Sequence, residues 1–219
     1  MPLYLRPHAE VAERVLLPGD PGRALRLAQQ LLTEPKMLNH HRGLWGYTGA
    51  AADGAPMTIQ STGLGGPSAA IVAQELIALG ARRLVRVGTC GALADLPLGS
   101  LVIAETVRPT DGASRAIGAG GELPADPQLL AALLAAGEGA ASGRVVSTDL
   151  YYAPVPETDA LAVDLTTAAI LAVAARDGAA AAAVLAVSDH MATGERLDPE
   201  ALEHAEVELG RVGAAAFAA

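Results

Sequence analysis

The sequence is poor in cysteine, aromatic residues and basic residues, and two of these shortages exclude classes of protein. Cys90 is the only cysteine among 219 residues, so no disulfide forms within the chain, and zinc sites built from several cysteines are excluded. The 15 Lys and Arg stand against 24 Asp and Glu, a formal charge of -9. Such a balance argues against general binding of nucleic acid, and an anionic substrate needs a local basic pocket.

Long hydrophobic runs are also absent. Residues 1–10 contain charged and polar side chains and no apolar signal-peptide segment, so we expect a cytoplasmic protein. The longest apolar stretches, such as 179–187, are far shorter than the roughly 20 residues of a membrane span. Because 51% of the residues are hydrophobic, the chain can still bury a large core, and its length suits a single domain over 1–219.

Short β-branched runs alternate with longer segments rich in Ala and Leu, which predicts an α/β fold: three layers, α/β/α, around a mixed, largely parallel sheet. The expected strands are 15–17, 56–61, 84–88, 101–106, 144–147 and 182–188. The expected helices are 23–32, 68–79, 127–136, 166–176 and 199–211. Segment 109–127, rich in Gly and Ala, is predicted to be a long surface loop.

Two strand ends carry features that suit an anion. The turn 18–22 (PGDPG) joins an expected strand to a helix that begins near Arg23, and its backbone N–H groups and this arginine can hold an oxyanion. An ordinary turn is the alternative. Arg86 lies inside an apolar strand that ends in the turn 88–91 (GTCG), so its charge must meet either an internal carboxylate or a bound anion. Thr89 is expected just beyond the strand end, where open α/β sheets bind ligands.

Two further strand ends point to a reacting centre. The glycine-rich segment 62–68 (TGLGGPS) allows a ligand to approach the backbone closely. The apolar strand 184–187 ends in Ser188, Asp189 and His190, and a carboxyl group at such a position can act as a general acid. The alternative is that Asp189 only caps the following turn.

Together these segments resemble the nucleoside phosphorylase family, which includes hexameric bacterial purine nucleoside phosphorylases and uridine phosphorylases. The resemblance is carried by LLPGDPGRA from Leu16, HRGLWGYTG from His41, STGLGGPSAAIVAQEL from Ser61, LVRVGTCGAL from Leu84 and VLAVSDH from Val184. They look closer to the purine-cleaving branch. The resemblance implies the fold of that family, phosphorolysis of a nucleoside to free base and ribose 1-phosphate, and a homo-oligomer, dimer or hexamer, with shared active sites.

The resemblance also implies roles for individual residues. Asp189 would protonate the departing base. Phosphate would be held by Gly19, Arg23, Arg86 and Thr89, and by Arg42 offered to the site of a neighbouring subunit. Sugar and base would be contacted by Leu64, Gly65, Cys90, Gly91, Tyr151, Leu165, Thr166 and Ser188. Inorganic phosphate is the co-substrate, and the reaction requires no metal or organic cofactor, because phosphate stabilises the positive ribose ring while a proton neutralises the base.

The sequence departs from the family at the sugar. The family has a Glu-Met-Glu signature whose second glutamate binds both ribose hydroxyls, and here the matching residues are Asp164, Leu165 and Thr166. A family histidine that reaches a neighbour's 5′-hydroxyl aligns with Tyr4 more naturally than with His8. The family arginine that assists the base-side aspartate has only Arg196 as a counterpart.

Several functions therefore stay open. A purine nucleoside phosphorylase leads, and a uridine phosphorylase is the runner-up. A degenerate homologue that binds phosphate or nucleoside without turnover is favoured by Thr166. A hydrolytic nucleosidase does not need Arg23, Arg42 and Arg86 together, so their joint presence disfavours it. Fold alone does not decide among these functions, because function resides in the site.

Overall fold

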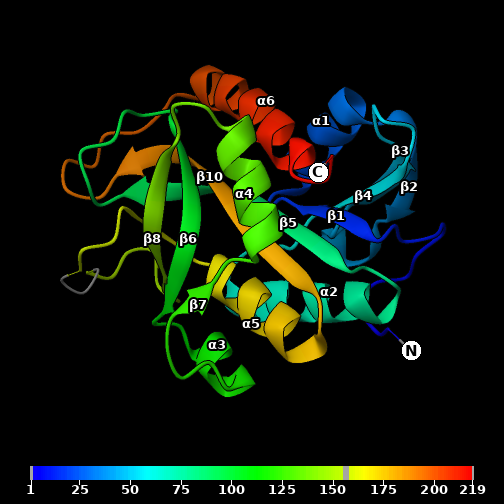
Figure 1. The fold of residues 1–219 in the computed structure, drawn as a ribbon, viewed down its shortest axis with the longest axis horizontal. Coiled ribbons are helices and arrows are strands. Elements are labelled where there is room, and N and C mark those ends of the chain that lie inside the picture. The colour runs from blue at the N-terminus through cyan, green and yellow to red at the C-terminus, as the bar shows by residue number, and fades with distance from the viewer. Residues whose placement is uncertain (1, 155–157, 219) are drawn as a thin grey trace.

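The computed structural model describes residues 2–154 and 158–218, which form an α/β/α sandwich around one sheet (Figure 1). Ten strands of the described residues make up this sheet: β1 (Arg14–Leu17), β2 (Thr33–Asn39), β3 (Gly46–Ala50), β4 (Pro56–Gln60), β5 (Arg83–Ala92), β6 (Leu101–Pro109), β7 (Leu123–Pro124), β8 (Ala141–Ser147), β9 (Ala162–Asp164) and β10 (Ala180–His190). Their order is β10-β6-β8-β9-β5-β1-β4-β3-β2, with β7 beside β6. Because β10 also pairs with β5, the first five strands of this order close on themselves.

Strands β4, β1, β5 and β10 run parallel, whereas β10 with β6, β5 with β9, and β3 with both β2 and β4 pair antiparallel, so the predicted mixed sheet is confirmed. In the register, Leu17 and Ala183 both pair with Arg86 from opposite sides. Parallel strands bring their carboxyl ends to one edge, and this is where open α/β sheets bind ligands. The four segments singled out in the sequence leave the sheet there.

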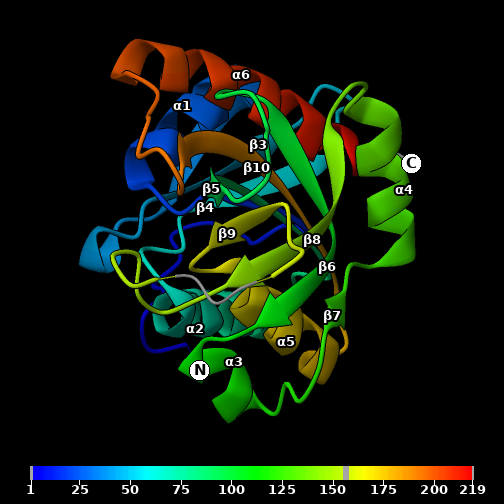
Figure 2. The same cartoon turned by 90° about the vertical axis from the view of Figure 1, so that its left-hand side faces the viewer.

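Helices cover both faces of the sheet, as Figure 2 shows from the side: α1 (Pro21–Leu31), α4 (Pro127–Ala136) and α6 (Pro199–Ala215) on one face, and α2 (Gly66–Ala78), α3 (Gly112–Ile117) and α5 (Thr167–Asp177) on the other. Successive residues of a strand point alternately to the two faces of the sheet and pack in different hydrophobic clusters. Leu84 packs in the cluster with α2 and α5, whereas its neighbour Val85 packs in the cluster with α1 and α6. This period of two is that of a strand buried on both sides.

Aspartate side chains cap the N-termini of four of the helices. Asp20, Asp111, Asp126 and Asp198 each accept a hydrogen bond from a backbone N–H in the first turn of α1, α3, α4 and α6. Proline follows directly in α1, α4 and α6, where its fixed φ suits the first helical turn. None of the helices in the described part of the chain is both long and apolar enough to cross a membrane.

All six predicted strands and five predicted helices are present, within a few residues, except that β5, β6, β8 and β10 extend further than expected. The long surface loop predicted over 109–127 is wrong: α3, capped by Asp111, and the short strand β7 lie within it. Strand β2 had no clear signal because it contains Pro35, and five of its seven residues are exposed. Strand β9 has only three residues, too few for a visible period.

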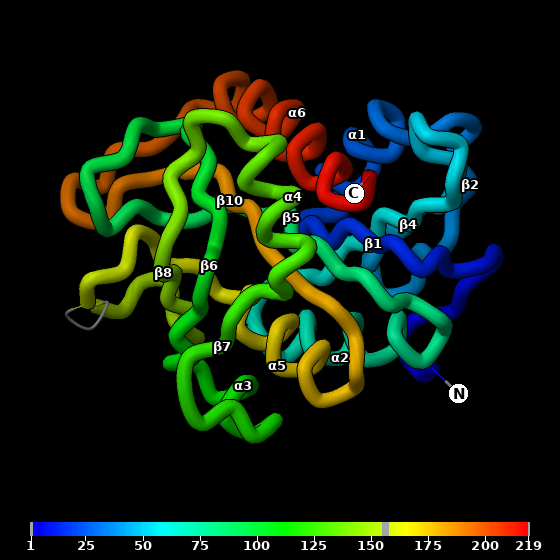
Figure 3. The backbone as a smooth tube through the Cα atoms, in the orientation of Figure 1, coloured from blue at the N-terminus to red at the C-terminus, as the bar shows by residue number. Residues whose placement is uncertain are grey.

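The N-terminal segment 2–7 lies beside α2 (Figure 3) and is hydrogen-bonded to it. The Glu75 carboxylate accepts hydrogen bonds from the backbone N–H groups of Leu3, Tyr4 and Leu5, at 2.6 to 3.1 Å. This brings Tyr4 to the short turn η1 (His41–Gly43), where its carbonyl oxygen lies 2.9 Å from His41 Nδ1.

Candidate active site

Arg86 is the centre of the anion-binding candidates. Its side chain folds back over Gly88, where a Cβ atom would lie 2.4 Å from the guanidinium carbon. Nη1 donates to the carbonyl oxygen of Leu17 at 3.3 Å, and Nη2 lies 3.6 Å from Asp164 Oδ2. Burial lowers the pKa of Arg86, an effect that the nearby Asp164 opposes. Nε is buried and has no partner among the described residues, so the pairing of this charge is incomplete.

Two glycine loops border Arg86. A Cβ atom at Gly19 would lie 3.6 Å from both Arg86 Nη1 and the carbonyl oxygen of Gly63. The loops are joined by backbone hydrogen bonds from Thr62 N–H to Pro18 O at 2.8 Å and from Gly63 N–H to Gly19 O at 3.1 Å. The guanidinium is therefore bordered by glycine backbone, and the N–H groups of such loops can hold a small oxyanion.

Arg23 belongs to the same group of charges. It lies in the first turn of α1, is 6% exposed, and donates from Nε to Glu206 Oε1 at 2.7 Å. Arg26, one turn further along, binds the other oxygen of the same carboxylate. The charge of Arg23 contributes to lowering the pKa of Arg86, so the two guanidinium groups are neighbours. The arginine cluster is defined here as Arg23, Arg26, Arg86, Asp164 and Glu206.

The internal carboxylate considered for Arg86 exists, as Asp164, but it leaves Nε of the guanidinium without a partner among the described residues. Asp164 accepts 2.6 Å hydrogen bonds from the hydroxyls of Ser147 and Thr167 and one from Thr167 N–H. These bonds leave Asp164 committed to the start of α5 and to Arg86, not free for sugar hydroxyls. Thr166, the residue before α5, is buried and its side chain does not cap the helix.

Asp189 lies at the end of β10 with both carboxyl oxygens engaged. Tyr151 donates to Oδ2 at 2.8 Å, and the Ser188 hydroxyl donates to Oδ1 at 2.7 Å. The pairing of β10 with β5 shifts register between Val187 and Asp189, and such a bulge re-aims side chains. Burial and the bond to Asp189 raise the pKa of Tyr151, so its hydroxyl remains a proton donor at neutral pH. The carboxyl site is defined here as Tyr151, Ser188 and Asp189.

A cavity of about 520 Å³ opens beside Asp189, a size that suits a small organic ligand. Tyr151, Met191 and Arg196 also line it. Arg196 lies with its guanidinium carbon 5.7 Å from the centre of the Tyr151 ring. Leu165 lines a smaller adjoining space that it shares with Tyr151 and Met191.

Cys90 and Gly91 lie between the arginine cluster and the carboxyl site. Burial raises the pKa of the Cys90 thiol, and the charges of Asp164 and Asp189 add to this effect while Arg86 opposes it. A Cβ atom at Gly91 would lie 3.1 Å from Asp189 Oδ2. The two groups of charges therefore form one candidate site along β5.

The remaining predicted residues lie around this site or outside it. Thr89 lies inside β5, paired with Ala186, so its expected place beyond the strand end is wrong: the strand continues to Ala92. Gly65 precedes α2 with a φ of 81°, and Leu64 before it is 85% exposed. Among the described residues no contact joins Arg42 to Arg23 or Arg86; it is exposed in η1, with its guanidinium 5.3 Å from the centre of the Tyr4 ring.

Two residues of the candidate site, Glu206 and Gly88, were not predicted from the sequence. Glu206 is 183 residues away from Arg23 in the chain, and nothing in the helical pattern of α6 marks it as an arginine partner. Gly88 had a readable signal, since a glycine two positions after an arginine in a strand lies on the same face and leaves it room.

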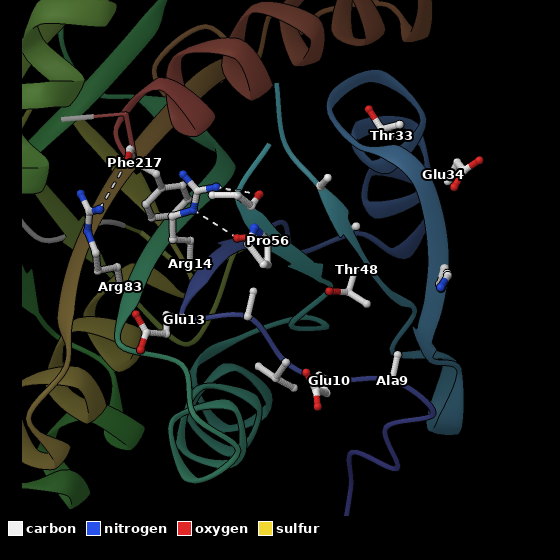
Figure 4. Close-up of a pocket in the computed structure, with 16 residues that line it drawn as sticks. Ala9, Glu10, Glu13, Arg14, Thr33, Glu34, Thr48, Pro56, Arg83 and Phe217 are labelled. Atoms are coloured by element: carbon white, nitrogen blue, oxygen red, sulfur yellow. Dashed lines mark hydrogen bonds between the residues drawn. The ribbon is translucent and has the colours of Figure 1, made fainter. Parts of the chain in front are cut away.

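A larger cavity, about 880 Å³, lies at the amino ends of β1, β4 and β5, the opposite edge of the sheet (Figure 4). Its arginines are already paired. Arg14 binds Asp53 and two backbone carbonyls, and Arg83 binds the carbonyls of Ala216 and Phe217. The unsatisfied buried donor of Arg86 and the hydrogen-bonded carboxyl of Asp189 make the other edge the candidate site.

The fold and the two groups of charges define an α/β protein that can hold a small anion beside a carboxyl group. The chain belongs to the phosphorylase superfamily, whose family model matches residues 13–218. It is 39% identical to a DeoD-type purine nucleoside phosphorylase of Jannaschia sp. (strain CCS1), over 87% of this chain and 88% of that protein. Similar relatives of the same name occur in Caldanaerobacter subterraneus (37%; 87% and 88%) and Geobacillus kaustophilus (38%; 87% and 86%).

Proposed function

We propose that this protein cleaves purine nucleosides with inorganic phosphate, giving free base and ribose 1-phosphate. The observation that carries the proposal is the presence, on the neighbouring strands β5 and β10, of an incompletely satisfied buried arginine, Arg86, and a hydrogen-bonded carboxyl group, Asp189. The names of the relatives favour purine over uridine substrates.

The arrangement suits the charges that develop in the reaction. Phosphate held by Arg23 and Arg86 near Gly19 would lie against the ribose ring as it becomes positive. Asp189, with Tyr151 and Ser188 fixing its two oxygens, would deliver a proton to the base. Holding phosphate beside the anomeric carbon removes much of the entropic cost of joining two reactants, and neither a metal nor an organic cofactor is required.

A second copy of the chain completes the proposed site. The support is that Arg42, expected from the family resemblance to bind phosphate, is exposed and points to Tyr4 instead of joining the arginine cluster. The homo-oligomer is therefore part of this proposal, and mixing an Arg42→Ala protein with an inactive Asp189→Asn protein should restore activity in mixed assemblies.

The test is release of base from inosine, adenosine, guanosine and uridine, each with and without phosphate. Cleavage that requires phosphate and favours a purine supports the proposal, and Asp189→Asn should lower turnover by about a hundredfold or more. Asp95→Asn, an exposed aspartate outside the site, is the matched control. Phosphate binding without any cleavage would instead indicate a degenerate binding homologue.

Sugar preference follows from Thr166. Since a neutral residue replaces the family glutamate and Asp164 is committed to Arg86, Ser147 and Thr167, the 2′-hydroxyl lacks a charged acceptor. We expect deoxyinosine to be turned over with a kcat/KM about tenfold above that of inosine, because a 2′-hydroxyl removed from water without an acceptor costs free energy that the deoxy sugar avoids. Equal values for the two substrates would contradict this assignment.

A further inference from the structure

Glu206 of α6 is a buried carboxylate that binds two arginines of α1. It is 3% exposed, Oε1 accepts from Arg23 Nε at 2.7 Å, and Oε2 accepts from Nε and Nη2 of Arg26. A buried carboxylate is stable only when paired in this way. Because Arg23 is itself a predicted phosphate ligand, the contact connects α6 to the anion site.

The contact with Glu206 uses Nε of Arg23 and not its two terminal nitrogens, Nη1 and Nη2. Glu206 takes Nε, and no hydrogen bond to Nη1 or Nη2 occurs within the described chain. A guanidinium group is planar, so holding Nε fixes the direction in which both terminal nitrogens point. Those two nitrogens are the pair that forms a bidentate contact with a phosphate.

Charge alone suggests the opposite role for Glu206. In the arginine cluster, three guanidinium groups share the carboxylates of Asp164 and Glu206, which leaves an excess of one positive charge. If Glu206 only balanced charge, removing its charge would strengthen phosphate binding. If Glu206 orients Arg23, a shorter side chain at position 206 would weaken phosphate binding even when the negative charge is kept.

We propose that Glu206 is a positioning residue that orients Arg23 for phosphate by holding its Nε. This inference rests on the proposed function, since it assigns phosphate to Arg23. It gives α6 a part in substrate binding that the helix would otherwise lack, because an acceptor at position 206 decides where the terminal nitrogens of Arg23 point.

Two conservative variants separate the roles. Glu206→Gln keeps the length of the side chain and an oxygen that accepts from Arg23 Nε, but loses the charge. Glu206→Asp keeps the charge but is one methylene too short for the 2.7 Å contact. The matched control is Glu203→Gln, one turn earlier on α6, an exposed carboxylate 3.9 Å from Arg26.

The measurement is the affinity for inorganic phosphate by titration calorimetry without nucleoside, followed by KM for phosphate and kcat, on proteins shown to be folded by urea unfolding. We expect Glu206→Asp to weaken phosphate binding and raise its KM by tenfold or more with little change in kcat. Glu206→Gln should stay within about threefold of the wild type, and Glu203→Gln should equal it.

The inference is overturned if Glu206→Gln binds phosphate more tightly while Glu206→Asp is unchanged, which is the result of charge balance. It is equally overturned if both variants weaken binding alike, if neither changes it, or if the wild type binds no phosphate. A wild type that binds phosphate but releases no base defeats the proposed function alone, because the calorimetric comparison of the two variants remains valid.

Discussion

At the level of single residues, Arg86 and Gly88 act as one unit. The guanidinium occupies the place where a side chain at position 88 would start, 2.4 Å from the position of a Cβ atom there. The position of the charge therefore depends on the absence of a side chain two residues along the same strand. This explains how a strand buried on both faces can hold a guanidinium group beside the carboxyl end of β1.

Gly88→Ala is expected to displace the Arg86 guanidinium and raise the KM for phosphate about tenfold or more, since a hydrogen bond to a charged group contributes roughly 1.5–3 kcal/mol. Steady-state kinetics with varied phosphate measures the effect. Gly120→Ala is the control, because a Cβ atom there meets nothing within 4 Å. An unchanged KM in Gly88→Ala would show that Arg86 does not bind phosphate in this position.

Cys90 is expected to be unreactive in the folded protein. Burial raises the pKa of its thiol, and the reactive species is the thiolate, so at pH 8.5 the group stays protonated. Reaction with a chromogenic disulfide reagent should be at least about a hundredfold slower before denaturation in guanidinium than after it. Rapid reaction of one thiol per chain in the native protein would mean that β5 is open to solvent at this point.

Among the elements, the helices with proline in their first turn are the most clearly encoded. In α1, α4 and α6 an aspartate precedes a proline, and each aspartate caps its helix in the structure. Local signals of this kind need no tertiary contact, which is why the start of α4 at Pro127 could be predicted.

Asp126→Ala should lower the free energy of unfolding by about 1 kcal/mol, because Asp126 accepts hydrogen bonds from the N–H groups of Gln128 and Leu129 at the start of α4. Urea denaturation gives the value. Glu138→Ala, an exposed position just after the same helix, should leave the stability within about 0.5 kcal/mol of the wild type. Equal stability of Asp126→Ala and the control would mean that the cap contributes nothing.

Elements and contacts that depend on distant residues were the ones that the sequence could not predict. Strands β2 and β9 gain their hydrogen bonds from neighbours, and α3 lies in a segment without periodicity. The same distinction holds in the site. Arg86 and Asp189 carried local signals, each a charged residue in or after an apolar strand, whereas Glu206 reaches Arg23 across 183 residues.

At the scale of the whole molecule, the parallel strands bring the charges together. Strands β1, β5 and β10 run parallel, so Gly19 after β1, Arg86 in β5 and Asp189 in β10 lie toward the same edge of the sheet although they are spread over 170 residues of chain. The opposite edge holds a larger cavity whose arginines are paired with aspartate or backbone carbonyls. Cavity size alone would point to that edge and not to the edge that holds the candidate site.

The central claim is that phosphate, not water, attacks the nucleoside. The most direct measurement follows a mixture of purified protein, inosine and inorganic phosphate by ³¹P nuclear magnetic resonance while hypoxanthine release is recorded. The account predicts a sugar 1-phosphate signal that grows in equal amount with the free base and is lost in Asp189→Asn. Release of base with no loss of inorganic phosphate would contradict it, because the arginine cluster would then have no part in the reaction.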